Sequence, residues 1–319
     1  MALPLIYALK DAGHQVILPS NQAAHPFYEF LAREGIISGI STYRHGSFRS
    51  WLEGFGNVDR LILPAGVEFH HHPLLWAIRK RPFFARAFLR LKMNVKSLEI
   101  IPDVYVKGEH SRLSVSNRAQ SYIQWMGRYG VAFKPETLFF QEDVLKKARL
   151  RAEKIIFDQG LRAHQYAVLY PATARSEKNI PLELLNEIIR YFSNSGLKLV
   201  LIGDSSHGGY PPLRDANLID LRGRRDFEEL VGLFSLSRVV LAVDGGLLHL
   251  ALASRAKTVS FWGATIPDSL VMPNHPYHHP LCRYLPFQPY EGEKITDAQR
   301  AEAFDFSIEE IVQAMRTPD

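Results

Sequence analysis

The sequence predicts an α/β fold in which parallel strands alternate with helices. The alternation is clearest in the second half, where short runs rich in valine, leucine and isoleucine are each followed by a helical pattern. Such runs are typical of strands buried on both faces, and strand–helix alternation is typical of parallel sheets. The length of 319 residues favours two domains over one.

Composition narrows the class of protein. Hydrophobic residues make up 46% and charged residues 22% of the chain, which is normal for soluble globular proteins. The net charge of +5 favours an anionic ligand or surface, without choosing among nucleotide, nucleic acid and membrane. The single cysteine, Cys282, excludes an internal disulfide and is compatible with the cytoplasm. We expect neither a signal peptide nor a membrane-spanning helix, because no basic leader and no apolar run of about 18 residues occurs.

The first half is predicted to form one domain, residues 1–160. Its expected elements are helices at 3–12, 27–33, 47–55, 113–128 and 141–158, and strands at 15–18, 36–43, 58–63 and 137–140. A doubly wound domain normally opens on a central strand. We therefore expect either that such a strand lies upstream of this chain or that the domain is incomplete.

Two stretches of the first half, residues 70–72 and 76–92, have compositions that suggest a function. His70, His71 and His72 are adjacent and lack the i, i+4 spacing of a helical metal site, so we expect a surface loop and no metal. The segment 76–92 interleaves aromatic residues with cations and has no acidic residue. It suits contact with an anionic membrane or an acidic substrate, while the alternative is a helix with one packed and one solvated face. The cations that would make this contact are Arg79, Lys80, Arg81, Arg86 and Arg90.

The second half is predicted as a domain at residues 161–300, followed by a C-terminal helix within 301–319. Its expected strands are 166–170, 197–202, 218–221, 239–244 and 258–262, and its expected helices are 181–192, 226–236, 247–254 and 307–316. Ligands of such sheets bind beyond the carboxyl ends of the strands.

One turn at such an end is the strongest candidate for a ligand site. Asp244 ends a strand, Gly245 and Gly246 follow, and a helix begins. The N-terminus of a helix attracts phosphate, and glycines let a ligand approach the backbone. His249 lies one turn into that helix, where we expect it to face the same ligand. The alternative is a helix cap with a tight turn and no ligand.

A second loop at the same edge adds Thr173, Arg175 and Lys178. Together the two loops offer cations, a hydroxyl and helix N–H groups to a diphosphate, while the alternative for Lys178 is a solvated loop lysine. The sequence has no GxGxxG, no GxxxxGK[ST] and no GxSxG. Their absence argues against the usual dinucleotide fold, the P-loop and the hydrolase elbow.

Four stretches in this order resemble the bacterial heptosyltransferases of glycosyltransferase family 9. Tyr170–Lys178 resembles their Ala-Thr-Thr loop with its lysine, and Asp244–Ala251 resembles their D-S/T-G-x-x-H-L-A motif. The other two are 220–230, similar to D-L-x-G…L-x-E-L, and 261–267, similar to F-G-x-T-x-P. Residues 3–9 resemble the helix after the family's first strand.

The resemblance implies a glycosyltransferase B architecture of two Rossmann-like domains. The donor nucleotide would lie in the C-terminal domain, the acceptor in the N-terminal domain, and the final helix would pack back on the N-terminal domain. It further implies transfer of heptose from ADP-heptose to a lipopolysaccharide core, with inversion and without metal or cofactor. Lys178 would hold donor phosphate with Thr173 nearby. Asp244, Gly245 and Gly246 would hold the sugar and diphosphate, and His249 would support their loop.

Three departures from the family pattern keep alternatives open. The family's general base is an aspartate in the turn after the first strand, a place that would precede Met1, so the catalytic residue is unknown. Gly245 replaces a serine or threonine, and Asn179-Ile180 replaces a tryptophan. The alternatives are a degenerate homologue that binds nucleotide-sugar or glycolipid without transfer, and a nucleotide-sugar epimerase.

The expected partners follow from the same resemblance. They are a nucleotide-diphosphate sugar donor, an anionic glycolipid acceptor and peripheral contact with the inner membrane from the cytoplasmic side. Nucleic acid is not expected, because no recognised nucleic-acid module is present in the sequence.

Overall fold

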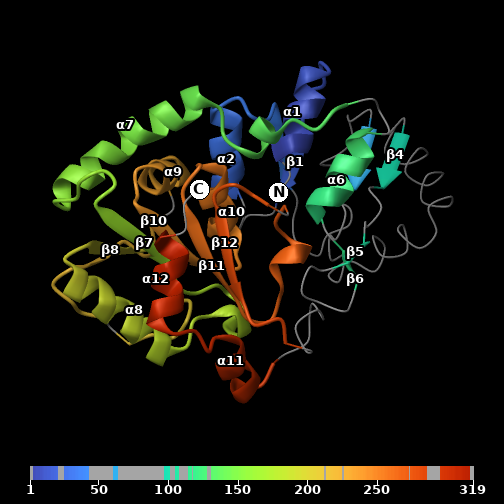
Figure 1. Cartoon of the computed structure of the whole chain (residues 1–319). Helices are drawn as coiled ribbons and strands as arrows, with labels where there is room; N and C mark the ends of the chain where they lie inside the picture. Colours follow the sequence, from blue (N-terminus) through green and yellow to red (C-terminus); the bar gives the residue numbers. More distant parts are fainter. Residues whose placement is uncertain are drawn as a thin grey trace. The chain divides into compact units, whose positions relative to one another are not determined.

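The computed structural model describes most of the second half of the chain and parts of the first. The described residues are 3–20, 25–42, 60–63, 97–100, 105–107, 114–116, 118–127, 131–211, 213–224, 226–272, 274–285 and 295–316. The chain forms two compact units, the first from residues 1–106 and 116–137, the second from 107–115 and 138–319 (Figure 1).

The second unit is built on a parallel six-stranded sheet in the order β12-β11-β10-β7-β8-β9. The strands are β7 (Tyr166–Tyr170), β8 (Lys198–Leu201), β9 (Leu218–Asp220), β10 (Val239–Val243), β11 (Thr258–Trp262) and β12 (His278–Cys282). The chain runs outward from β7 to β9 and then returns to β10, on the other side of β7. The strand order therefore reverses between β7 and β10, and the carboxyl ends of these two strands form the switch point where ligands of such sheets bind.

The central strands confirm the interpretation of the apolar runs. Every residue of β7, β10 and β11 is buried. The edge strand β12 was not predicted, because its sequence His-His-Pro-Leu-Cys has neither an apolar run nor alternation. Its proline, Pro280, is tolerated because the strand lies at the edge of the sheet.

Two groups of helices cover the sheet. The helices of this unit are α7 (Glu142–Asp158), α8 (Leu182–Ser195), α9 (Phe227–Ser235), α10 (Gly246–Ala253), α11 (Asp297–Ala303) and α12 (Ile308–Arg316). Contacts join α8 with α12, and they join α7 with α9 and α9 with α10. Because right-handed connections leave the switch point in opposite directions, these two groups cover opposite faces.

The division into units differs from the predicted boundary at 160. The units divide between Thr137 and Leu138, so α7 belongs to the second unit. Gly232 of α9 explains this, because a side chain there would overlap the Ala148 carbonyl oxygen of α7 and lie 2.7 Å from the Ala152 Cβ. The two helices therefore approach closely enough for backbone contact.

The C-terminal helix α12 has its described contacts with β11 and α8 of the second unit. Arg283 holds the start of this helix, because it donates to Glu310 of α12 at 2.9 Å and lies 4.4 Å above the ring of Phe306, which precedes the helix. Packing of this helix on the first domain stays a prediction.

The first unit contains α1 (Leu3–Asp11), α2 (His25–Arg33) and α6 (Arg118–Gly127). Its strands pair in parallel, β1 (Ile17–Ser20) with β2 (Gly39–Thr42) and β3 (Arg60–Leu63) with β4 (Ser97–Ile100). A core of Leu5, Tyr122, Trp125 and Met126 joins α1 to α6. Among the described residues no helix is long and apolar enough to cross a membrane.

Two sequence predictions for the part of the chain shortly before and at the division between Thr137 and Leu138 are wrong. The helix expected at 113–128 begins only at Arg118, because Ser114–Ser116 forms β6, which pairs with β5 (Tyr105–Lys107). The strand expected at 137–140 is a 3-10 turn, η2 (Pro135–Leu138), followed by two buried phenylalanines. Phe139 and Phe140 are apolar because they are buried, and they do not form a strand. The predicted helix at 47–55 and the three histidines lie outside the described residues.

Candidate functional site

The carboxyl ends of β7 and β10 bring the two predicted loops together. Lys178, from the loop after β7, donates to Asp244 Oδ2 across 2.5 Å. Both side chains are shielded from solvent, with 13% of the lysine and 3% of the aspartate side chain exposed. Asp244 directly follows β10. Residues 66 positions apart therefore form a buried ion pair at the switch point of the sheet.

A third loop contributes a residue that the sequence reasoning did not single out. Thr265, which follows β11, donates its hydroxyl proton to Asp244 Oδ2 across 2.6 Å. It is 2% exposed. Among the described residues Asp244 Oδ1 has no recorded hydrogen-bond partner. The sequence did contain a signal for Thr265, because a hydroxyl residue that follows β11 is expected at the same edge of the sheet as the residue that follows β10.

The loop after β7 is fixed by its own polar groups. Asn179, which is 4% exposed, accepts a hydrogen bond from the Thr173 backbone N–H across 2.7 Å. The Tyr210 hydroxyl lies 2.7 Å from the Ile180 carbonyl oxygen and donates to it. The Thr173 hydroxyl accepts from the Arg175 N–H across 3.0 Å. Asn179 therefore has a structural role in holding this loop.

Arg175 lies at the more exposed end of the same loop. Its Nε donates to Glu177 across 2.6 Å, and 37% of the arginine side chain remains exposed. Burial disfavours the charged form of Glu177, but hydrogen bonds and the charges of Arg175 and Lys178 outweigh it, so its pKa lies below the usual value. The Arg175 side chain therefore remains partly accessible to a ligand.

The N-terminus of α10 adjoins the ion pair. Gly245 is its N-cap and provides no side-chain hydrogen bond, and Gly246 is exposed. The first N–H groups of a helix have no intrahelical partners, and this end of the helix dipole is positive. The Gly245 backbone is extended, with φ −173°, so glycine is required there by space. A Cβ atom would lie 2.8 Å from Thr173 Cγ2 and 2.9 Å from the Tyr170 hydroxyl.

His249 lies half-buried one turn into α10. Its charge contributes to lowering the pKa of His278 on β12, after the larger effect of burial. The imidazole therefore lies within electrostatic reach of the edge strand. A direct role toward a ligand stays a prediction for this residue.

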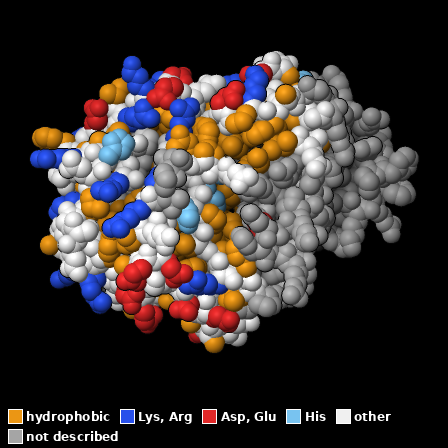
Figure 2. Space-filling view, viewed as in Figure 1, with side chains coloured by type: hydrophobic (Ala, Val, Ile, Leu, Met, Phe, Trp, Pro, Cys, Tyr) orange, Lys and Arg blue, Asp and Glu red, His pale blue; other side chains and the backbone are white. Residues whose placement is uncertain are grey.

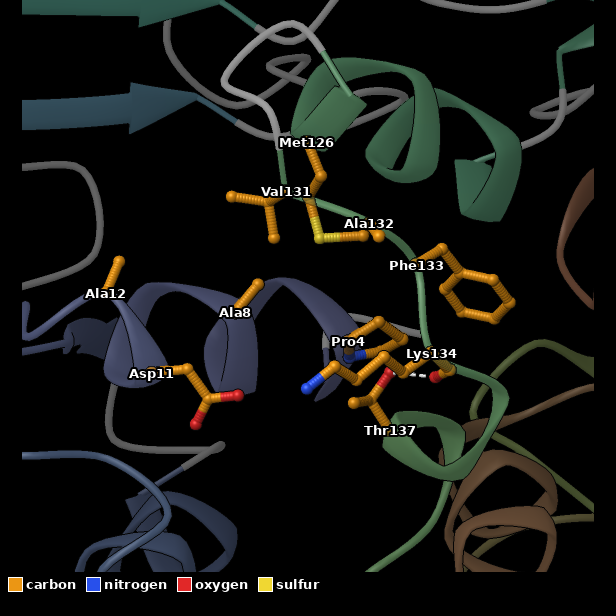
Figure 3. Close-up of a pocket in the computed structure, with 10 residues that line it drawn as sticks. All are labelled: Pro4, Ala8, Asp11, Ala12, Met126, Val131, Ala132, Phe133, Lys134 and Thr137. Atoms are coloured by element: carbon orange, nitrogen blue, oxygen red, sulfur yellow. Dashed lines mark hydrogen bonds between the residues drawn. The ribbon is translucent and has the colours of Figure 1, made fainter.

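The first unit has a pocket of about 270 Å³ between α1 and the segment 131–137. Figure 3 shows Met126 and Val131 on one side of it and the polar groups of Asp11, Lys134 and Thr137 on the other. The predicted acceptor cations Arg79, Lys80, Arg81, Arg86 and Arg90 lie outside the described residues.

The visible surface carries both signs of charge. On the described part of the face in Figure 2, basic side chains are interspersed with acidic ones. This distribution differs from the continuous basic stripe typical of nucleic-acid-binding proteins.

Comparison with known families finds similarities to the second half of the chain. Residues 134–281 match the model of glycosyltransferase family 9 (heptosyltransferase). Lipopolysaccharide heptosyltransferase 1 of Salmonella typhimurium is 30% identical over 119 residues, covering 36% of this chain and 38% of that protein. The Escherichia coli K12 protein of the same name is 28% identical over 108 residues, covering 33% of this chain and 34% of that protein. The alignments thus span little more than a third of these relatives.

Solved structures confirm the predicted architecture over more of the chain. The ADP-heptose lipopolysaccharide heptosyltransferase II of E. coli aligns with a TM-score of 0.62 at 14% identity, covering 98% of this chain and 92% of that one. A glycosyltransferase family 9 protein of Veillonella parvula aligns with a TM-score of 0.57 at 16% identity, covering 88% and 82%. These likenesses show the fold, the two-domain glycosyltransferase B architecture. The match to the model of glycosyltransferase family 9 (heptosyltransferase) covers residues 134–281, less than half of the chain, and shows what this part of the chain is similar to.

Proposed function

We propose that this chain is an inverting glycosyltransferase that moves a sugar from a nucleoside-diphosphate donor to a glycan. The observation that supports it best is the buried cluster of Lys178, Asp244 and Thr265 beside the N-terminus of α10. ADP-heptose as donor and a lipopolysaccharide core as acceptor are favoured by the names of the relatives.

The diphosphate of the donor would bind between Lys178 and the first turn of α10. Gly245 and Gly246 have no side chains to keep it from the backbone N–H groups. Thr173 and Arg175 lie on the loop that carries Lys178, and the half-exposed guanidinium suits a phosphate oxygen. Because Lys178 is already paired with Asp244, its ammonium would be shared between the carboxylate and the phosphate.

Asp244 would hold the sugar. Its Oδ2 accepts from both Lys178 and Thr265, which fixes the plane of the carboxylate. Its Oδ1 is left to accept a hydrogen bond from a sugar hydroxyl. A carboxylate held by two donors loses little conformational freedom when it binds, so its orientation is prepared in advance.

In the proposed reaction an acceptor hydroxyl attacks the anomeric carbon on the face opposite the diphosphate. The new carbon–oxygen bond forms as the bond to the diphosphate oxygen breaks, and a base takes the hydroxyl proton. Negative charge then grows on the leaving diphosphate, beside Lys178 and the positive end of α10. Positive groups placed where charge develops lower the barrier. We further propose that the cations between Arg79 and Arg90 contact the anionic acceptor or the membrane that carries it.

A transfer assay tests this proposal. The purified chain is given ADP-heptose and a heptose-free lipopolysaccharide core in EDTA, and product is measured by mass spectrometry. We expect transfer by the wild type and loss of at least 100-fold in the variant K178M/D244N, which removes both charges and leaves no buried ion unpaired. The control is Lys154→Ala, an exposed lysine of α7. Transfer that persists in K178M/D244N would contradict the proposed site, and hydrolysis or epimerisation without transfer would contradict the reaction.

A further inference from the structure

Tyr170 is the last residue of β7, and its ring lies between two glycines. A Cβ atom at Gly203, which follows β8, would lie 3.1 Å from the ring carbons Cδ2 and Cε2. A Cβ atom at Gly245, which follows β10, would lie 2.9 Å from the hydroxyl. The side chain therefore spans the carboxyl ends of three neighbouring strands, and the ring fits because both flanking positions lack side chains.

The Tyr170 hydroxyl has no recorded hydrogen-bond partner among the described residues, although the side chain is only 7% exposed. Two other tyrosines of this unit differ. The Tyr166 hydroxyl donates to the Leu233 carbonyl oxygen across 2.7 Å, and the Tyr210 hydroxyl donates to the Ile180 carbonyl oxygen. Although the residue is buried, its hydroxyl is not among the fully buried side-chain atoms without a partner, so the hydroxyl keeps some contact with solvent. A hydroxyl that reaches solvent at the N-terminus of α10, on a ring held between two glycines, is open to a hydrogen bond with a ligand bound there.

The protonation state of the phenol decides which kind of ligand it meets. Burial raises the pKa of Tyr170 to about 12, and the charges of Asp244 and Asp204 contribute to the increase. The phenol therefore keeps its proton at neutral pH and acts as a hydrogen-bond donor. An oxygen of an anion is the matching acceptor, and anions are what the adjacent helix terminus and Lys178 attract.

We propose that the Tyr170 hydroxyl donates a hydrogen bond to the diphosphate of the bound nucleotide-sugar, and so takes the place of a side-chain hydroxyl at position 245. Tyr170 and Gly245 then form a compensating pair, because the tyrosine hydroxyl fills the volume that a serine or threonine at 245 would need. This inference rests on the proposed function, since it assumes that a nucleoside diphosphate binds at this edge of the sheet.

The first test compares two conservative variants by isothermal titration calorimetry. The probe is whichever of ADP, GDP, UDP, CDP and dTDP the wild type binds most tightly, with the corresponding nucleoside as a probe without phosphate. Tyr170→Phe removes only the hydroxyl, and we expect it to weaken diphosphate binding about 10-fold or more while leaving nucleoside binding unchanged. The matched control is Tyr166→Phe on the same strand, which loses the hydrogen bond to Leu233 and should keep the wild-type affinity.

The second test exchanges the pair. In the wild-type background Gly245→Ser should abolish binding, because its side chain meets both Thr173 and Tyr170. In Y170L/T173S/G245S the serine at 245 gains room on both sides, since T173S removes the methyl group and keeps the hydroxyl, so the affinity should recover beyond that of the control Y170L/T173S. Equal affinity of Tyr170→Phe and wild type, with binding lost in K178M/D244N, would overturn the role of Tyr170 and keep the proposed site. Failure of the wild type to bind any of the five diphosphates would overturn both.

Discussion

At the scale of single residues, the candidate site depends on how one buried carboxylate is satisfied. Asp244 is 3% exposed and accepts from Lys178 and Thr265 through the same oxygen. A buried charge is tolerated only when it is paired and hydrogen-bonded. Both donors are thus expected to support the fold as well as the binding of a ligand, and variants must separate the two roles.

Thr265→Val removes one of these donors without changing the shape of the side chain. We expect a loss of about 1–3 kcal/mol in the free energy of unfolding, because a hydrogen bond to a charged buried group is lost. Urea denaturation measures it, and Thr265→Ser, which keeps the hydroxyl, is the control. A loss no larger in the valine variant than in the serine variant would show that the hydroxyl does not support Asp244.

Lys178→Met leaves the Asp244 carboxylate without its counter-ion. We expect it to destabilise the protein by about 3–5 kcal/mol, and to do so more than the double variant K178M/D244N. The reason is that an unpaired buried charge costs more than a neutral pair of similar size. Urea denaturation of the two single variants and the double variant forms a double-mutant cycle. Simple addition of the two single effects would mean that the pair is not coupled.

At the scale of elements, the crossing of α7 and α9 assigns α7 to the second unit. It depends on Gly232, where a side chain would overlap the backbone of Ala148. Helix propensity favours alanine over glycine, so the sequence gives no sign that this glycine is needed. The need for glycine at this position comes from the contact between two helices that are far apart in the sequence, so the residues around Gly232 do not indicate it.

Gly232→Ala therefore reverses the usual effect of this substitution. We expect a loss of about 1–3 kcal/mol or more in the free energy of unfolding, because the added methyl group forces the helices apart. Gly127→Ala is the control, since Gly127 ends α6 and a Cβ there has nothing within 4 Å. Thermal or urea unfolding gives the result, and an unchanged or raised stability of Gly232→Ala would contradict the close crossing.

The strand predictions were most accurate where burial alone determined the sequence of the strand. β7 and β11 were predicted with the observed bounds, because strands buried on both faces need uninterrupted apolar residues. β12 was missed because an edge strand has no such requirement. Lys178 and Asp244 were both named from their loops, but their ion pair depends on the strand order, in which β10 returns to lie beside β7. Sequence alone does not fix that order, and Thr265 was missed for the same reason.

At the scale of the whole molecule, the buried His275 and the half-buried His278 connect stability to pH. Burial lowers the pKa of His275 to about 4 and that of His278 to about 3. In the unfolded chain both would titrate near the ordinary histidine value of about 6.5. Between these values the unfolded state binds more protons than the folded state, so acid favours unfolding.

We therefore expect the free energy of unfolding to fall as the pH decreases from about 6.5 to about 4. Urea denaturation between pH 7.5 and pH 4.5 measures this slope, and His278→Asn should reduce it. The carboxylates Glu177, Asp220 and Glu310, whose pKa values are lowered, lose their contribution only at still lower pH, below their unfolded values near 4. A stability that stays constant down to pH 4.5 would contradict the lowered pKa values of these two imidazoles.

The most direct measurement of nucleotide binding at the β7–β10 switch point is thermal unfolding of the chain with ADP, GDP, UDP, CDP and dTDP, each in EDTA. A ligand at about 100 times its dissociation constant adds about 2.7 kcal/mol, which raises the midpoint by several degrees. We predict a selective rise with ADP in the wild type and in Lys154→Ala, and no rise in K178M/D244N. A rise that survives in K178M/D244N would place the nucleotide elsewhere, and no rise with any of the five would contradict a nucleotide site in this chain.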